Sequence, residues 1–414
     1  MARVLAMILA LLLAWYAVLC VRWPGVIGDE LYHVPAIEGI LAGDWTRAWA
    51  LPMPPAFHAL VAGAAGLVGT DLWLLRGVSL LIGIAAIRVY WAALSADGRP
   101  GDATALFQFA ALPLLLPFWV LVYTDMLALL TVLVALACHG RGWRLAAALA
   151  LLVGMLVRQS NAIWPLVFIG WHMLEHWGEA RPATADAPRT PARLGRALVA
   201  ARGAWPYALA LLCGSAFNLV ENPLTADQPA ENRPTFNIAQ VFGLGMTLAL
   251  IWAAVWVPHV PSLWRGWLAR GLVRAPLAAA LVAVAGGLAV LYRNQHGWNG
   301  NLDYVRNWPL VGMSTYPLLR IAMAALIVLF MATCAHWAYQ RGAARAAVVW
   351  IVGLIYLAPH GLVDPRYYLV PVVLADFAMP YTPTERRRLV AWYATLTLLL
   401  ALMMYFRPAG AAML

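Results

Sequence analysis

Long blocks of apolar residues recur along the whole 414-residue chain, and short polar stretches separate them. The first two blocks, at residues 4–22 and 72–94, are each long enough to cross a bilayer, because about 20 helical residues span its apolar core. We expect the remaining transmembrane helices at 103–122, 124–139, 145–157, 162–177, 204–221, 235–257, 276–292, 314–337, 346–359, 367–381 and 389–406. The pattern predicts one all-α, polytopic membrane domain over residues 1–414, with about 13 transmembrane helices.

Between the first two spans lies a polar and aromatic stretch, residues 23–71, which we expect to form the first exterior loop. Apolar residues recur there at helical spacing, at Leu31, Val34, Ile37 and Leu41. This spacing predicts an amphipathic helix on the membrane surface, which Pro35 would kink or restart. The proline cluster at residues 52–55 should end one surface helix and begin another, since proline blocks helix continuation but suits a first turn.

Composition supports the membrane assignment, because 64% of the residues are hydrophobic and only 11% are charged. Four cysteines lie inside or at the end of apolar blocks, without CxxC or Cys/His spacing. We therefore expect the cysteines to be packing residues and expect no metal site.

The arginines divide the loops into two sets, and all 28 basic residues are arginine. Outside residues 178–203, the loops that alternate to the cytoplasmic side contain Arg99, Arg141, Arg144, Arg265, Arg270, Arg274, Arg341, Arg345, Arg386, Arg387 and Arg388. The positive-inside rule then predicts a cytoplasmic N-terminus and makes residues 178–203 a cytoplasmic Arg- and Pro-rich linker. Because loop arginines encode topology, the net charge of +10 does not indicate nucleic-acid binding.

Asp29, Glu30 and His33 stand together just after the first span, in a chain that has few charges. Residues 29 and 33 share a face if this segment is helical, which places a carboxylate beside an imidazole at the membrane surface. We interpret this group as the reaction centre. The alternative is that Asp29 caps a surface helix and Glu30 complements its dipole.

Two arginines occur where an unpaired cation is costly. Arg158 interrupts an apolar sequence, and Arg366 follows Asp364 at the start of a span. Burial of such a charge in a bilayer costs about 3 kcal/mol or more, so each arginine needs an anion. The anion is either a structural carboxylate, such as Asp125 for Arg158, or a ligand phosphate, which suits the planar guanidinium fork. Together with the carboxylates at 29 and 30, the arginines fit transfer of a sugar from a lipid phosphate to a hydroxyl group.

Three motifs carry a resemblance to a known family. They are Asp29-Glu30-Leu31-Tyr32-His33; Tyr123-Thr124-Asp125 followed by Arg158-Gln159-Ser160-Asn161-Ala162-Ile163-Trp164; and Asp364-Pro365-Arg366-Tyr367-Tyr368-Leu369-Val370-Pro371. Asp227, Asn237 and Gln240 resemble a fourth, weaker motif. With these motifs the chain resembles the dolichyl-phosphate-glucose-dependent α-1,2-glucosyltransferases of lipid-linked oligosaccharide assembly, which belong to the GT-C class of integral-membrane glycosyltransferases.

The resemblance implies a GT-C-like helical bundle and an inverting transfer of a sugar, in the first instance glucose. The donor would be a polyprenyl- or dolichyl-phosphate sugar, and the acceptor a glycan or lipid-linked glycan on the exterior side. Asp29 would be the base, with Glu30 as its partner or the second candidate. The expected substrate-binding residues are His33, Tyr123, Asp125, Arg158, Gln159, Asn161, Asp227, Asp364, Arg366 and Tyr367. We expect no cofactor and no metal, and a bacterial inner-membrane location with the site facing the periplasm. Two alternatives stay open: a transporter or flippase of lipid-linked sugars, and a GT-C transferase that acts on lipid A or protein.

Overall fold

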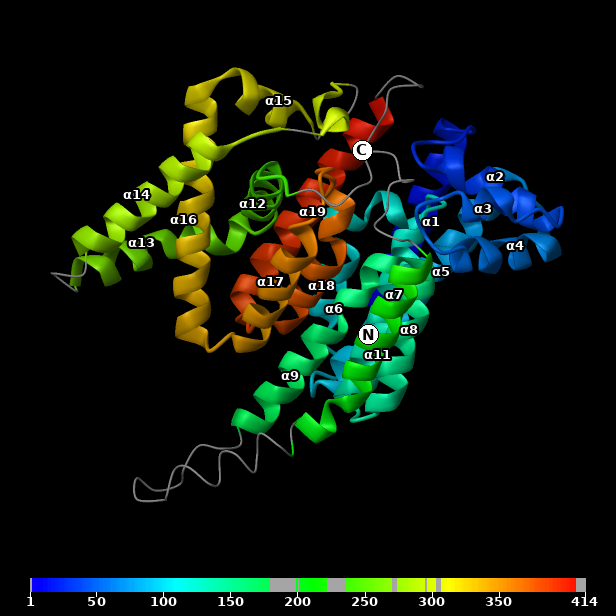
Figure 1. Ribbon diagram of the computed structural model, residues 1–414, viewed down its shortest axis with the longest axis horizontal. Helices are drawn as coiled ribbons and strands as arrows, with labels where there is room; N and C mark the ends of the chain where they lie inside the picture. Colours follow the sequence, from blue (N-terminus) through cyan, green and yellow to red (C-terminus); the bar gives the residue numbers. More distant parts are fainter. Residues whose placement is uncertain are drawn as a thin grey trace.

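The computed structural model describes residues 2–178, 199, 201–221, 236–269, 274–294, 296–302 and 307–406. Every regular element in this part of the chain is a helix, as the sequence predicts (Figure 1). Most of the linker expected at 178–203 lies outside the described residues, so its structure stays a prediction.

Residues 23–71, the segment expected on the exterior side and called the exterior loop below, contain short helices, as their pattern predicts. Helix α1 (Ala2–Arg22) and helix α5 (Leu72–Ala96) flank the loop, which contains α2 (Glu30–Leu41), α3 (Thr46–Trp49) and α4 (Ala56–Val68). Helix α2 packs against α4, and in Figure 1 these helices lie together at one edge of the molecule. The loop is therefore a small layer of short helices beside the longer ones.

Pro35 lies inside α2 without ending it, so the restart expected at this residue is wrong. Proline removes one backbone donor from the helix, the one that would pair with the carbonyl of Leu31. The helix persists because its buried face, which includes Ile37, joins the same apolar core as Phe57 and Val61 of α4. Tertiary packing here outweighs a local helix-breaking preference.

The middle of the chain forms α6 (Ala103–Ala110), the 3-10 turns η1 (Pro113–Leu115) and η2 (Pro117–Trp119), α7 (Thr124–Gly140), α8 (Arg144–Val157), the 3-10 helix η3 (Gln159–Ile163), α9 (Pro165–Gly178) and α11 (Trp205–Glu221). Helix α7 packs between α5 and α8, and α11 packs against α8 and α9. Gly140 is part of the α5–α7 contact, since a Cβ at this position would lie 2.9 Å from the Cβ of Ala96. The two helices can thus approach closely where α5 ends.

The remaining elements are α12 (Ala239–Ile251), α13 (Ala253–Ala269), α14 (Arg274–Leu291), the 3-10 helix η6 (Gly297–Gly300), α15 (Trp308–Thr315), α16 (Pro317–Arg341), α17 (Ala344–Leu357), the 3-10 helix η8 (Pro365–Tyr368), α18 (Leu369–Ala378) and α19 (Pro383–Phe406). Helix α17 packs against α9 and α18, which joins this half to the middle of the chain.

Four helices of the described chain are long and apolar enough to cross a membrane alone, namely α1, α5, α16 and α19. Helices α12 and α13 meet the same criterion together but are bent by 93°. Six other apolar helices are shorter, so the expected count of 13 spans is not confirmed. Prolines are one cause of the shorter helices. A single helix was expected at 103–122, but α6 ends at Ala110 and two 3-10 turns follow it, which begin at Pro113 and Pro117.

Arginine-rich loops gather at one end of the helix bundle. Arg345 forms an ion pair with Asp97 at 2.8 Å, and Arg386 forms one with Asp102 at 2.6 Å. Asp97 directly follows the C-terminal end of α5, whereas Arg76, near the N-terminal end of the same helix, contacts the exterior loop. About 20 helical residues, or roughly 30 Å, separate these positions, so the arginine-rich loops and the exterior loop lie at opposite ends of α5.

Candidate active site

The Gly28–Asp29 corner fixes the start of the site. Gly28 has a φ of +55°, and a Cβ here would lie 2.3 Å from the hydroxyl oxygen of Tyr123, so only glycine fits. The backbone N–H of Asp29 donates a hydrogen bond to that same oxygen at 2.7 Å. The corner is thereby attached to the segment that precedes α7, where the second motif begins.

Asp29 precedes α2, but its side chain makes no capping hydrogen bond to that helix. The carboxylate instead contacts the guanidinium of Arg366, which comes from η8. About a third of the Asp29 side chain (34%) is exposed. The structure therefore does not support Asp29 as a side-chain cap of α2, and its carboxylate remains accessible from outside the protein.

Glu30 has a different environment, because its side chain is completely buried. Arg76 donates to both of its oxygens, at 3.0 and 2.7 Å, and the backbone N–H groups of Ile27 and Val122 donate at 2.9 and 3.0 Å. Arg76 also donates to the carbonyl oxygen of Trp23 at 2.6 Å. This network connects the exterior loop, α5 and the start of α7, so Glu30 is positioned to organise the loop rather than to meet a substrate.

Arg76 was missed by the sequence reasoning, although a signal was present. It is a single charged residue in the first half of an apolar span, and such residues carry a nearby partner by default. What the sequence does not show is which acid forms the pair, because Glu30 lies 46 residues away.

A second acid and arginine pair lies beside the first. Asp125, in the first turn of α7, forms an ion pair with Arg158 at the break between α8 and η3. The ring of Tyr367 lies near two guanidinium groups, 5.3 Å from that of Arg158 and 5.5 Å from that of Arg366. The structure therefore brings together members of all three motifs, with Tyr367 as their common neighbour.

Arg366 has two carboxylate neighbours. Besides Asp29, the Asp364 carboxylate lies 3.2 Å from its Nε atom. The other oxygen of Asp364 accepts a hydrogen bond from the backbone N–H of Arg366 at 3.0 Å, which caps η8. Asp364 is buried, so its visible role is to orient the arginine.

His33 is buried and forms a hydrogen-bonded pair with His58 of α4, with 2.9 Å between the ring nitrogens. The ring of His33 also lies edge-on to Tyr123, with 5.7 Å between the centroids. Burial lowers the pKa of His33 to about 3, helped by His58, and lowers the pKa of His58 to about 4. The pair is therefore neutral near pH 7, and His33 packs beside the Gly28–Asp29 corner through its contact with Tyr123.

The motif after Arg158 has mainly structural contacts. Gln159 donates from its amide to the carbonyl oxygen of Pro52, which attaches η3 to the exterior loop. Asn161 is buried, donates to the carbonyl oxygens of Ala128 and Gly154, and accepts from Trp164 at 3.1 Å. The side chain of Asn161 thus positions the segment next to Arg158.

Three amide side chains hold the loop that leads to Asp364. Asn237 donates to the carbonyl oxygen of Gly361 at 2.7 Å, and Gln240 donates to that of His360 at 3.1 Å. Asn299, which the sequence analysis did not select, accepts from the backbone N–H of Val363 at 2.9 Å. Asp227, the remaining expected site residue, lies outside the described residues.

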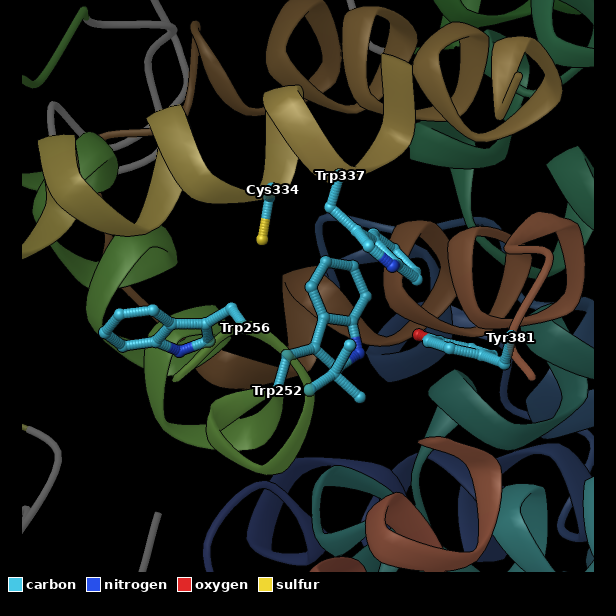
Figure 2. Close-up of a pocket in the computed structure, with 6 residues that line it drawn as sticks. Trp252, Trp256, Cys334, Trp337 and Tyr381 are labelled. Atoms are coloured by element: carbon cyan, nitrogen blue, oxygen red, sulfur yellow. The ribbon is translucent and has the colours of Figure 1, made fainter. Parts of the chain in front are cut away.

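A small cavity lies elsewhere and is unrelated to these motifs. It has a volume of about 10 Å³ and is lined by Trp252, Trp256, Cys334, Trp337 and Tyr381 (Figure 2). This volume suits about one water molecule and is far too small for a sugar.

The comparisons with known proteins decide the family. The model of the DIE2/ALG10 family matches residues 24–297, which include the first two motifs. The chain belongs to the DIE2/ALG10 family. This is the family of dolichyl-phosphate-glucose α-1,2-glucosyltransferases, so the resemblance seen in the motifs is confirmed, and the protein is a membrane glycosyltransferase that uses a lipid-linked sugar.

Two solved structures resemble this DIE2/ALG10 protein. They are ArnT from Cupriavidus metallidurans in the apo state (18% identity, TM-score 0.41, 95% of this chain and 76% of that chain) and the same enzyme bound to undecaprenyl phosphate (18% identity, TM-score 0.40, 95% and 77%). No curated protein matches the chain.

Proposed function

We propose that this protein moves a glucosyl group from a polyprenyl-phosphate carrier to a hydroxyl group of a glycan or lipid-linked acceptor, with inversion at the anomeric carbon. One observation carries the proposal: Asp29 and Arg366 meet near the pair formed by Asp125 and Arg158, and the ring of Tyr367 lies close to both guanidinium groups. These residues come from four separate segments of the chain. A partly exposed carboxylate beside two cations matches the needs of this reaction.

Asp29 is the proposed general base. An acceptor hydroxyl is a poor nucleophile, so a carboxylate within hydrogen-bond reach must accept its proton as the bond to the anomeric carbon forms. Glu30 is the less suitable carboxylate, because its oxygens already accept four donors and its side chain is buried. We therefore assign Glu30 a positioning role and no contact with the acceptor.

Arg158 and Arg366 are proposed to hold the donor phosphate. Each guanidinium already has a carboxylate neighbour, Asp125 or Asp29, which balances its charge. A phosphate that approached Arg366 would share or replace the contact with Asp29, which would leave that carboxylate available to the acceptor. The leaving phosphate is a weak base that cations stabilise, so the reaction needs no general acid.

The proposed reaction requires no metal, since the two arginines supply the positive charge at the phosphate. Turnover should therefore be unchanged when the purified protein is assayed with EDTA. Loss of turnover with EDTA and its return with one divalent cation would contradict this part of the proposal.

We further propose that the site faces the exterior, which is the periplasm if the protein lies in a bacterial inner membrane. The support is that the arginine-rich loops lie at the end of α5 opposite the site, and the positive-inside rule assigns such loops to the cytoplasm. The test uses Trp45→Cys or Arg387→Cys in a variant whose own four cysteines are replaced. An impermeant thiol reagent added to intact cells should label position 45 and not position 387, and the reverse result overturns the orientation.

The deciding experiment supplies purified protein with polyprenyl-phosphate glucose, with other polyprenyl-phosphate hexoses, and with candidate glycan, lipid A and peptide acceptors. Mass analysis should find a glycan that has gained one hexose, together with free polyprenyl phosphate. Transfer to lipid A or peptide alone would replace the proposed acceptor. Movement of an intact lipid-linked sugar across a vesicle membrane, without cleavage of the sugar–phosphate bond, would establish the transporter instead.

A further inference from the structure

A groove with a mainly apolar lining and two arginines lies at the arginine-rich end, far from the motifs. It has a volume of about 770 Å³ and lies between the turn that joins α7 to α8 and the start of α11. The residues that matter to its chemistry are Trp143, Arg144, Ala146, Leu149, Arg202 and Trp205, all of which line it. Helices α8 and α11 pack against each other along this side (Figure 1).

The groove contains the N-terminus of a long helix. Helix α8 has 14 residues, and its first intrahelical hydrogen bond runs from the N–H of Ala147 to the carbonyl oxygen of Trp143. The backbone N–H groups of Leu145 and Ala146 precede that bond, and both residues line the groove. Such a helix end attracts anions through its unpaired donors and its dipole.

Two guanidinium groups add charge to this helix end. Arg144 and Arg202 line the groove from different elements, one from α8 and one from the residues before α11. Neither side chain has a hydrogen-bond or ion-pair partner among the residues that the structure describes. Within the described chain, no carboxylate neutralises either charge.

A separate observation comes from a residue directly behind Gly203, which lines the groove. His172 of α9 is 99% buried (1% exposed), and neither of its ring nitrogens has a hydrogen-bond partner within the described chain. A Cβ on Gly203 would lie 2.4 Å from the Nε2 atom of His172 and 2.7 Å from the Nη1 atom of Arg144. Glycine thus lets a groove-lining backbone pass directly over an unpartnered imidazole, with an arginine beside it, and buried polar groups of this kind normally have a partner.

The rim of the groove is apolar and exposed. Trp143 is 60% exposed and Trp205 is 55% exposed, while Leu145 and Leu149 extend along the outer face of α8 with 56% and 53% exposed. Tryptophans at this level are typical of the boundary between headgroups and acyl chains, and leucines beyond them suit the chains.

We propose that this groove binds an anionic phospholipid of the surrounding leaflet. The phosphate would lie at the N-terminus of α8 between Arg144 and Arg202, and one acyl chain would follow Leu145 and Leu149. Basic pockets between helices on the cytoplasmic side suit such headgroups. Free phosphate shares the headgroup chemistry, but it would make no use of the apolar rim. The proposal does not depend on the transferase mechanism, because the site uses none of the motif residues.

The test measures lipid retention by native mass spectrometry of the full-length protein, titrated with phosphatidylglycerol, phosphatidylcholine or inorganic phosphate. The key variant is Arg144→Gln with Arg202→Gln. Its control is Arg387→Gln with Arg388→Gln, which removes two exposed arginines from the same end of the molecule. Ala146→Glu is a second variant, which places a negative charge in the groove while favouring the helix dipole, so its fold should be preserved.

We expect phosphatidylglycerol to be retained by the parent protein and the control, and its apparent affinity to fall roughly tenfold or more in the double variant and in Ala146→Glu. Phosphatidylcholine and inorganic phosphate should be retained weakly by all four proteins. Equal affinity for phosphatidylglycerol in the parent protein and Ala146→Glu overturns the proposal, even if the double variant fails to fold. Equal retention of phosphatidylcholine, or displacement of phosphatidylglycerol by millimolar phosphate, overturns the assignment to an anionic lipid.

Discussion

Replacing Asp29 with Asn should slow the reaction without removing donor binding. The amide keeps the size of the carboxylate and can still approach Arg366, but it can scarcely accept a proton from the acceptor. The backbone contact of residue 29 with Tyr123 does not involve the side chain, so the corner should keep its shape. We expect turnover to fall by roughly 10²-fold or more, the usual scale for a general base, which corresponds to about 2.7 kcal/mol at the transition state.

Glu30→Gln is the matched comparison, and its effect should be of another kind. Both Glu30 and Arg76 are at most 1% exposed, so the substitution leaves a buried guanidinium without its counter-charge. Breaking a buried pair in this way typically costs about 3–5 kcal/mol of folding free energy. The variant should therefore show a lower melting temperature and a lower yield of monodisperse protein, effects that Asp29→Asn should largely lack because its ion pair is partly exposed.

The assay combines three measurements on each variant: turnover with polyprenyl-phosphate glucose, donor affinity, and thermal stability in detergent. Asp29→Asn should change turnover alone, while Glu30→Gln should change stability first. Near-normal turnover in Asp29→Asn would refute its role as the base. If Asp29→Asn keeps near-normal turnover while a stably folded Glu30→Gln loses it, the two roles are exchanged. If neither substitution lowers turnover, the reaction centre is elsewhere.

Three further outcomes can be measured. Arg158→Ala or Arg366→Ala should weaken donor binding at least tenfold and should also lower the melting temperature, because each leaves a nearly buried carboxylate, Asp125 or Asp364, without its counter-charge; unchanged donor affinity in a folded variant would make both residues structural. Because the pKa values of His33 and His58 are lowered to about 3 and 4, the folded protein favours neutral rings, so the free energy of unfolding should be complete above about pH 6.5 and decrease as the pH falls towards 4; a flat melting profile would contradict this. Gly28→Ala should impair both stability and turnover, because alanine would be forced into a positive φ and its Cβ would overlap the hydroxyl of Tyr123. Normal melting and activity would show that the corner can relax.

The segments proposed to carry the chemistry were visible in the sequence because each is a polar cluster in an apolar chain. Asp29, Arg158 and Arg366 were selected for that reason, and they converge as expected. The helical class and the short helices within residues 23–71 followed from periodicity alone. The boundaries of the transmembrane spans were predicted less accurately from the sequence, because the prolines at 113 and 117 break a hydrophobic run that composition alone would count as one helix.

Only the tertiary structure determines which charged residues pair with each other. Two neighbouring carboxylates, Asp29 and Glu30, are nearly equivalent along the chain, yet one is partly exposed beside Arg366 and the other is buried against Arg76. Hydrophobic patterning is a local property, because burial of an apolar face follows from residues a few positions apart. Ion pairs between residues 46 and 337 positions apart in the sequence depend on how the helices pack, and so the chemical difference between these two acids arises only in the folded protein.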